Sequence, residues 1–97
     1  LPLGRMRFRP GGSAGTHLGM QSILRAAGTE QIPRLRMGIG SDLKTGPAEA
    51  FVLRPFAKAE QPMVKTLIEH AYEGIMTFIH RDIETAMNTY NQIDETQ

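Results

Sequence analysis

Two short segments alternate arginine with apolar side chains, and this alternation constrains the fold more than any other feature of the chain. In RMRFR, residues 5–9, Met6 and Phe8 alternate with arginines, and PRLRMGIG, residues 33–40, repeats the pattern. A period of two residues is typical of a strand with one buried face, because successive side chains point to opposite faces of a sheet. The sequence therefore predicts two half-buried strands. Gly38 in the second segment has no side chain, so another part of the chain can approach its backbone closely.

A glycine-rich segment follows the first of these strands and leads into a helical pattern. PGGSAGTHLGMQS, residues 10–22, contains four glycines. Thr16 is an acceptable N-cap, Ile23 and Leu24 are expected to pack inward, and Gly28 supplies a stop. Neither the Walker pattern nor the dinucleotide fingerprint is present. A glycine-rich turn that opens a helix still leaves backbone N–H groups at a positive dipole end, where they can bind an anion or line a substrate cleft.

The rest of the chain predicts one more strand and two helices. Residues 41–49 have loop composition, and AFVL, residues 50–53, is typical of a short third strand. An amphipathic pattern begins at Pro62, bends near His80 and resumes at Ile83. The expected order is β-α-β-β-α-α, which indicates an α/β domain with a small sheet. A length of 97 residues allows one domain at most.

The composition excludes several classes of site. The chain has no cysteine, so it has neither disulfides nor thiolate metal ligands, which fits a reducing compartment. No apolar run approaches the ~18 residues that a membrane helix needs. The three histidines, His17, His70 and His80, have no converging partners that predict a metal site or a nucleophilic catalytic set. No cofactor is expected.

Charge is distributed unevenly along the chain. Residues 1–40 carry six arginines and one glutamate, for a net charge of +5, whereas residues 41–97 carry five basic and nine acidic residues, for −4. A basic half in a small domain favours a surface that faces a polyanion, although a solvated charged surface remains the alternative.

The arginines of the two predicted strands add to the expectation of a surface that binds a polyanion. If the two strands are neighbours, Arg7 and Arg9 stand beside Arg34 or Arg36, with no acidic residue on those faces. Guanidinium groups suit phosphate oxygens because they donate paired hydrogen bonds. The sequence therefore favours phosphate contact over a merely solvated face.

Several segments, in their order along the chain, resemble the bacterial peptidyl-tRNA hydrolase family. GGSAGTHLGMQSI is similar to the family's G-G-x-x-G-G-H-N-G-L-x-S-I motif, and PRLRMGIG is similar to its R-L-R-I-G-I-G strand. AFVLRPFAKAEQ resembles the family's V-L-x-x-F-x-x-x-E segment, and IETAMNTYN resembles its terminal I-E-x-A-M-N-x-F-N. The resemblance spans nearly the whole chain, and LPLG at residues 1–4 is similar to the segment that directly follows the family's D-x-x-D.

This resemblance implies an enzyme that hydrolyses the ester between a peptide and tRNA in the cytoplasm, without a metal. It implies that residues 1–97 are the C-terminal half of a single-domain, mixed-sheet hydrolase fold. The family's catalytic histidine and aspartate then lie in a missing N-terminal half, and this chain contains no catalytic residue. We expect the half alone to be inactive and prone to self-associate, and the full-length enzyme to be a monomer that binds peptidyl-tRNA and no membrane.

The resemblance also assigns site residues by position. Four residues fall at the edge of the substrate cleft: Gly15, His17, Leu18 and Gly19. Four others match basic positions implicated in tRNA binding: Arg7, Arg9, Arg36 and Lys44. Leu18 stands where the family has an asparagine that hydrogen-bonds substrate, and a leucine side chain cannot form that hydrogen bond. A non-catalytic RNA-binding protein of the same fold therefore stays open as an alternative, and an anion-binding α/β module of another kind is a weaker one.

Overall fold

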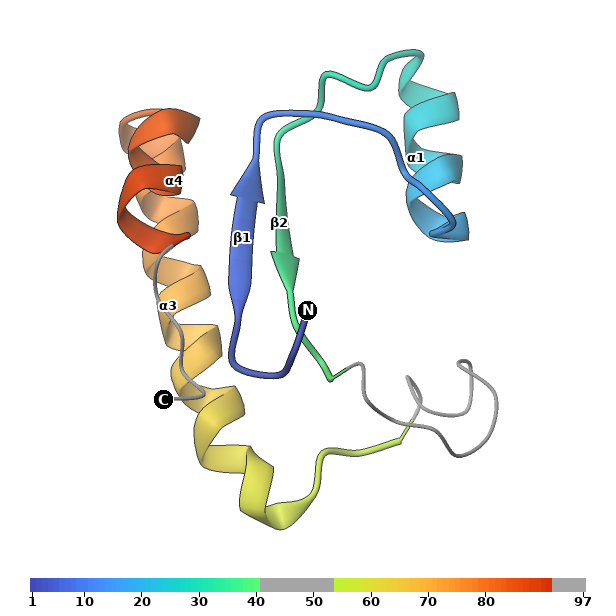
Figure 1. The fold of residues 1–97 in the computed structure, drawn as a ribbon. Coiled ribbons are helices and arrows are strands. Elements are labelled where there is room, and N and C mark those ends of the chain that lie inside the picture. Colours follow the sequence, from blue (N-terminus) through green and yellow to red (C-terminus); the bar gives the residue numbers. More distant parts are fainter. Residues whose placement is uncertain (41–53, 92–97) are drawn as a thin grey trace.

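The computed structural model describes residues 1–40 and 54–91, and these form two strands flanked by helices (Figure 1). The elements are β1 (Met6–Arg9), α1 (Leu18–Ala27), β2 (Arg34–Met37), the 3-10 turn η1 (Lys58–Glu60), α3 (Gln61–His80) and α4 (Ile83–Tyr90). The expected α/β class is confirmed. The strand expected at residues 50–53 lies outside the described residues.

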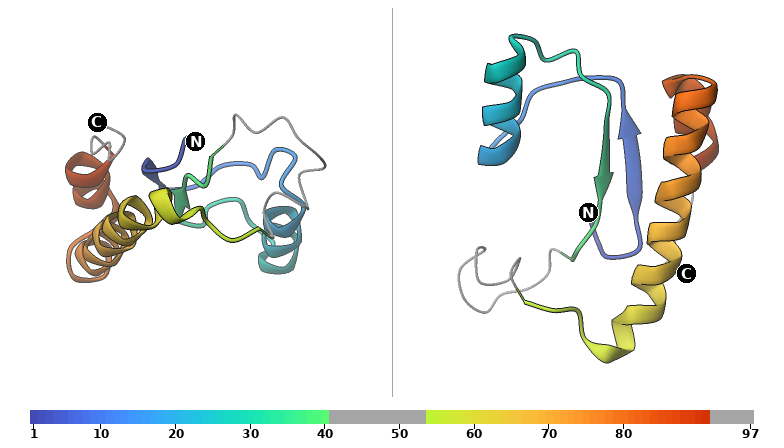
Figure 2. Two further views of the ribbon diagram at one scale, coloured as in Figure 1. Left: turned by 90° about the horizontal axis from the view of Figure 1, so that it is seen from below. Right: turned by 180° about the vertical axis from the view of Figure 1, so that it is seen from behind.

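The two strands pair antiparallel, as their shared alternation predicts. Met6 lies opposite Met37 and Phe8 opposite Leu35, while each arginine of β1 lies opposite an arginine of β2. β1 lies beside α3 and α4, and the opposite side of the sheet leads to α1 (Figures 1 and 2). Gly38 extends the pairing by donating its N–H to the Arg5 carbonyl at 2.8 Å.

The expected close approach at Gly38 occurs, and the segment that approaches is the start of the chain. A Cβ at Gly38 would meet the carbonyl oxygen of Pro2, so any side chain at this position would displace the N-terminal segment.

The core joins β1 to the helix pair. Met6 and Phe8 are each 3% exposed and pack with Leu67, Ala71 and Ala86. Gly74 in α3 makes room for the Phe8 ring, because a Cβ there would lie 2.6 Å from Phe8 Cε2. Overlap of that size cannot be accommodated in a packed interior without displacing the ring.

Asn91, just after α4, binds the backbone of β1. Its Oδ1 accepts from the Phe8 N–H at 2.6 Å, and its Nδ2 donates to the Phe8 carbonyl at 3.0 Å. The amide thus satisfies the polar groups of β1 on the edge away from β2, as a third strand would.

The helix boundaries agree with the sequence except at the start of α1. Gly28 ends α1 with φ 74°, as expected. The N-cap, however, is His17 and not Thr16, because His17 Nδ1 accepts the Met20 N–H. Ile23 was expected to pack inward but is 53% exposed, whereas Leu24 is buried.

The bend expected near His80 is confirmed. α3 ends at His80, and Asp82 caps α4 by accepting the Thr85 N–H at 2.7 Å. Hydrogen bonds from the Thr85 side chain and from the Thr85 N–H lower the pKa of the Asp82 carboxyl below its ordinary value of 3.8.

α3 presents two apolar faces, where the sequence pattern predicted one. Leu67, Ala71 and Gly74 face the core. A second row on an adjacent face of the helix is exposed, and we call it the α3 stripe: Ile68, Tyr72, Ile75 and Ile79. No helix within the described ranges is both long and apolar enough to cross a membrane.

Candidate functional site

A cavity of about 660 Å³ lies where the glycine loop, defined as residues 10–17, faces β2. It is bounded by the loop, the first turn of α1 and the β2 segment, with these lining residues: Arg9, Gly11, Gly12, Ser13, Ala14, Gly15, His17, Met20, Arg34, Leu35, Arg36, Met37 and Ile39. The glycine-rich segment and the second alternating segment, both singled out in the sequence, therefore border one cavity.

Four consecutive carbonyl groups of the glycine loop accept hydrogen bonds from within the protein. Arg34 donates to Gly12 and Ser13, at 2.8 and 3.2 Å. The Ala14 carbonyl accepts the His17 N–H at 3.1 Å, and the Gly15 carbonyl accepts from Gln21 Nε2 at 2.8 Å. The loop is thus held in a defined shape.

Two glycines are required for the shape of this loop. Gly12 and Gly15 have φ angles of 132° and 59°, in a region that residues with a Cβ rarely adopt. The glycines at positions 12 and 15 are therefore explained by the backbone conformation of the loop.

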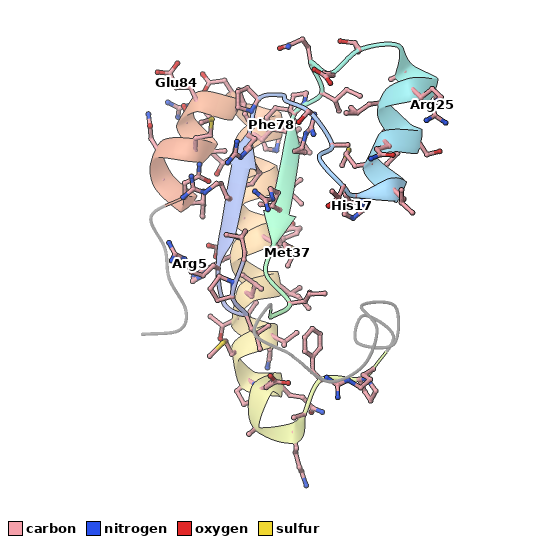
Figure 3. The ribbon with its side chains drawn as sticks, turned by 45° about the vertical axis from the view of Figure 1, so that its right-hand side comes forward. Arg5, His17, Arg25, Met37, Phe78 and Glu84 are labelled. Carbon is pink, nitrogen blue, oxygen red and sulfur yellow. The ribbon has the colours of Figure 1, made fainter. Side chains whose placement is uncertain are left out.

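His17 lies where the loop enters α1 (Figure 3). Its Nδ1 accepts the Met20 N–H at 3.0 Å. An Nδ1 that accepts a hydrogen bond carries no proton, so the neutral ring holds its proton on Nε2. The side chain is exposed and lines the cavity, so Nε2–H is available as a donor to a ligand.

The strand arginines divide into two kinds. Arg7 pairs with Arg36 and Arg9 with Arg34 across the sheet, an arrangement in which like charges repel. Among the residues that the structure describes, the side chains of Arg7, Arg9 and Arg36 make no hydrogen bond or salt bridge. Arg34 instead donates to four backbone carbonyls: those of Gly12, Ser13, Glu30 and Ile32.

Within residues 1–40 and 54–91, no group of three or more histidine or acidic side chains could hold a metal ion. The arrangement supplies guanidinium groups, a ring N–H and a loop whose carbonyls are occupied. Such a set can bind an anionic ligand.

The match to a known protein family agrees with the resemblance of the sequence motifs described above. The family model described as peptidyl-tRNA hydrolase matches residues 1–97. The chain belongs to the peptidyl-tRNA hydrolase family.

Individual members of the family support the same assignment. The peptidyl-tRNA hydrolase of Salinibacter ruber is 38% identical over 91 residues, covering 94% of this chain and 48% of that protein. The peptidyl-tRNA hydrolase of Synechococcus elongatus is 43% identical over 96 residues, covering 94% of this chain and 46% of that protein. The chain thus spans about half the length of the curated relatives it matches.

A solved structure has the same fold. The peptidyl-tRNA hydrolase of Acinetobacter baumannii superimposes with a TM-score of 0.83 at 26% identity, covering 98% of this chain and 48% of that one. The fold described here is therefore that of a segment of a peptidyl-tRNA hydrolase.

The residues expected at the cleft separate into two pairs in this member of the peptidyl-tRNA hydrolase family. Gly15 and His17 line the cavity, whereas Leu18 and Gly19 do not. Leu18 is the first residue of α1 and is 77% exposed, so it is not part of the core.

The expected tRNA-binding residues are similarly divided. Arg9 and Arg36 line the cavity, Arg7 does not, and Lys44 lies outside the described residues. Arg34 was grouped with the phosphate-binding candidates, but its guanidinium is occupied by backbone carbonyls. No sequence signal distinguished it from Arg36, because both alternate with apolar residues on the same strand.

Proposed function

We propose that residues 1–97 are the C-terminal half of a peptidyl-tRNA hydrolase, and that this half supplies a wall of the substrate cleft and part of the tRNA-contacting surface. The observation that carries the proposal is the cavity itself. Arg9 and Arg36, without internal partners in the described part of the chain, meet the glycine loop and His17 there. The family assignment supplies the substrate class.

In the proposed reaction, a water oxygen attacks the ester carbonyl carbon that joins the peptide to the tRNA ribose. The ester C–O bond then breaks, the ribose oxygen takes a proton, and the products are a peptide carboxylate and free tRNA. The general base that takes the proton from water belongs to the half of the enzyme outside this chain. Donors in the glycine loop region would stabilise the negative charge that develops on the carbonyl oxygen.

Three strand arginines, Arg7, Arg9 and Arg36, which we call the arginine face, have a separate role in this proposal. Arg7, Arg9 and Arg36 bind tRNA phosphates and so provide affinity without contacting the reacting ester. The full-length enzyme acts as a monomer in the cytoplasm, where peptidyl-tRNA is made, and this half alone is inactive.

The test uses the full-length protein and purified peptidyl-tRNA. We expect hydrolysis by the full-length protein and none by residues 1–97, measured against a mock preparation that controls for contaminating host enzyme. Tight tRNA binding without hydrolysis would instead support the non-catalytic RNA-binding alternative, which the exposed Leu18 in place of asparagine favours.

A second measurement tests the arginine face. Replacing Arg9 and Arg36 together by glutamate should weaken tRNA binding and lower the log–log salt slope by about 0.7–0.9 for each phosphate that the protein no longer neutralises. Arg25→Glu, at the exposed end of α1, is the control and should leave the slope unchanged. A loss half as large in Arg25→Glu, which changes the net charge by half as much, would show that only net charge matters.

A further inference from the structure

We propose that Arg34 is a positioning residue that fixes the glycine loop against the turn preceding β2, residues 29–33, and that Arg34 does not contact tRNA. The inference rests on the proposed function for its catalytic consequence, although its structural part can be tested without any activity. It separates Arg34 from the arginines beside it on the same sheet.

All three guanidinium nitrogens of Arg34 donate to backbone carbonyls. Nη2 reaches Gly12 at 2.8 Å and Glu30 at 3.1 Å, Nη1 reaches Ser13 at 3.2 Å, and Nε reaches Ile32 at 3.2 Å. Two acceptors belong to the glycine loop, and two belong to the segment that leads into β2. One side chain therefore joins two stretches of backbone about twenty residues apart.

The two stretches are also in direct contact. The Gly12 N–H donates to the Glu30 carbonyl at 2.9 Å, and this is the same oxygen that accepts from Arg34. A Cβ at Gly11 would lie 3.0 Å from that oxygen, so the backbones approach as closely as glycine permits.

Only arginine can make this set of contacts. Its guanidinium is planar and presents five N–H donors in fixed directions, whereas a lysine ammonium donates from a single nitrogen. Arg34→Lys would keep the positive charge of the sheet but remove most of the connection between loop and turn.

The contacts matter for the cavity because of the charge that carbonyl oxygens carry. A carbonyl turned toward a phosphate or a developing oxyanion would repel it. With Arg34 in place, the Gly12 and Ser13 oxygens are neutralised by a cation, and the backbone that continues to His17 is held in one conformation. Arg34 thus acts on substrate through the loop.

The test compares Arg34→Lys with Arg25→Lys in the full-length protein. We expect Arg34→Lys to raise the amide hydrogen exchange rate of Gly12 by about tenfold, since this N–H is protected only while it donates to the Glu30 carbonyl. We expect kcat to fall by about tenfold because the loop no longer positions the substrate. The tRNA affinity and its salt slope should stay within about twofold, because the charge is kept. Arg25→Lys should change none of these.

Other outcomes overturn the inference. A reduced salt slope with unchanged Gly12 exchange would make Arg34 a phosphate contact. If Arg34→Lys does not fold, the exchange rate of the guanidinium protons of Arg34 is measured in the wild-type protein instead. Slow exchange that persists when tRNA is added supports the inference, and fast exchange rejects it. Absence of hydrolysis by the wild-type protein would reject the proposed function, while the Gly12 exchange would still test Arg34.

Discussion

Leu18 and His17 are adjacent, but the start of α1 gives them different environments. His17 turns back to cap the helix and lines the cavity, whereas Leu18 projects into solvent with 77% of its surface exposed. An exposed leucine at the helix start contributes little to stability. Leu18 matters for function because the family motif has an asparagine at this position.

Leu18→Asn in the full-length protein should raise kcat/KM by about tenfold, because an amide offers the substrate both a donor and an acceptor. The melting temperature should stay the same, since the leucine side chain is not packed in the core. Steady-state kinetics and calorimetry measure the two effects. Ile23→Asn, also exposed on α1, is the control. Flat activity together with a large drop in melting temperature would contradict the alignment of the loop.

Asp82 gives a prediction about pH. Hydrogen bonds from Thr85 lower the pKa of Asp82, so its ionised form is favoured in the folded state. The stabilisation is therefore complete above the ordinary carboxyl pKa of 3.8 and disappears as the pH falls through the lowered value. Asp82→Ala should melt at a lower temperature than the wild type at neutral pH, and the difference should narrow in acid. Glu84→Ala, also in the first turn of α4, should show a smaller difference. A gap that is constant down to pH ~2 would contradict this interpretation.

At the scale of elements, the sequence predicted what depends on neighbours along the chain. Both strands, the stop at Gly28 and the bend near His80 follow from local patterns, and all are present. The contacts of Gly74 and Asn91 were not predictable, because each depends on Phe8, which is distant in sequence. A glycine within a helix and an asparagine after one have no local signature for such partners.

The candidate site was predictable to a similar degree. His17, expected at the cleft edge, lines the cavity, and so do Arg9 and Arg36, which the resemblance assigned to tRNA binding. The N-cap at His17 and the hydrogen bonds of Arg34 could not be predicted from the sequence. Both depend on which backbone group lies within reach of a side chain, and alternation carries no information about that.

Asn91→Ala should destabilise the chain by about 1–3 kcal/mol, because both backbone groups of Phe8 lose their partner. Asn91→Asp should cost at least as much, since a carboxylate would face the Phe8 carbonyl that now accepts from Nδ2. Denaturant unfolding measures the differences. Asn88→Ala, on an exposed position of α4, serves as the matched control, and equal losses at the two positions would reject the Asn91 assignment.

The whole molecule is thin and has little interior. It measures 36 × 29 × 16 Å, and its radius of gyration of 14.4 Å exceeds the roughly 12.5 Å of a compact domain of this length. In the described ranges, no large side chain is completely buried. The α3 stripe adds exposed apolar surface beside the core-facing side of that helix.

The isolated chain should therefore self-associate through the α3 stripe. Sedimentation velocity at increasing concentration should show dimers or larger species. Replacing Ile75 and Ile79 by lysine should shift the population toward monomer, whereas lysine at Thr89, exposed on α4, should not. A monomer at every concentration, without binding of an apolar dye, would count against this.

The hydrogen bonds between Asn91 and Phe8 also have a consequence while the chain is being synthesised. At about 5–20 residues per second, the 83 residues between them take the ribosome about 4 to 17 s to add. Throughout that interval, β1 exists without the amide that occupies its outer edge, and until residues 61–90 have been added it also lacks the complete helix pair that covers Met6 and Phe8. A nascent chain that stops before Asn91 therefore keeps an open strand edge, the feature by which aggregation begins.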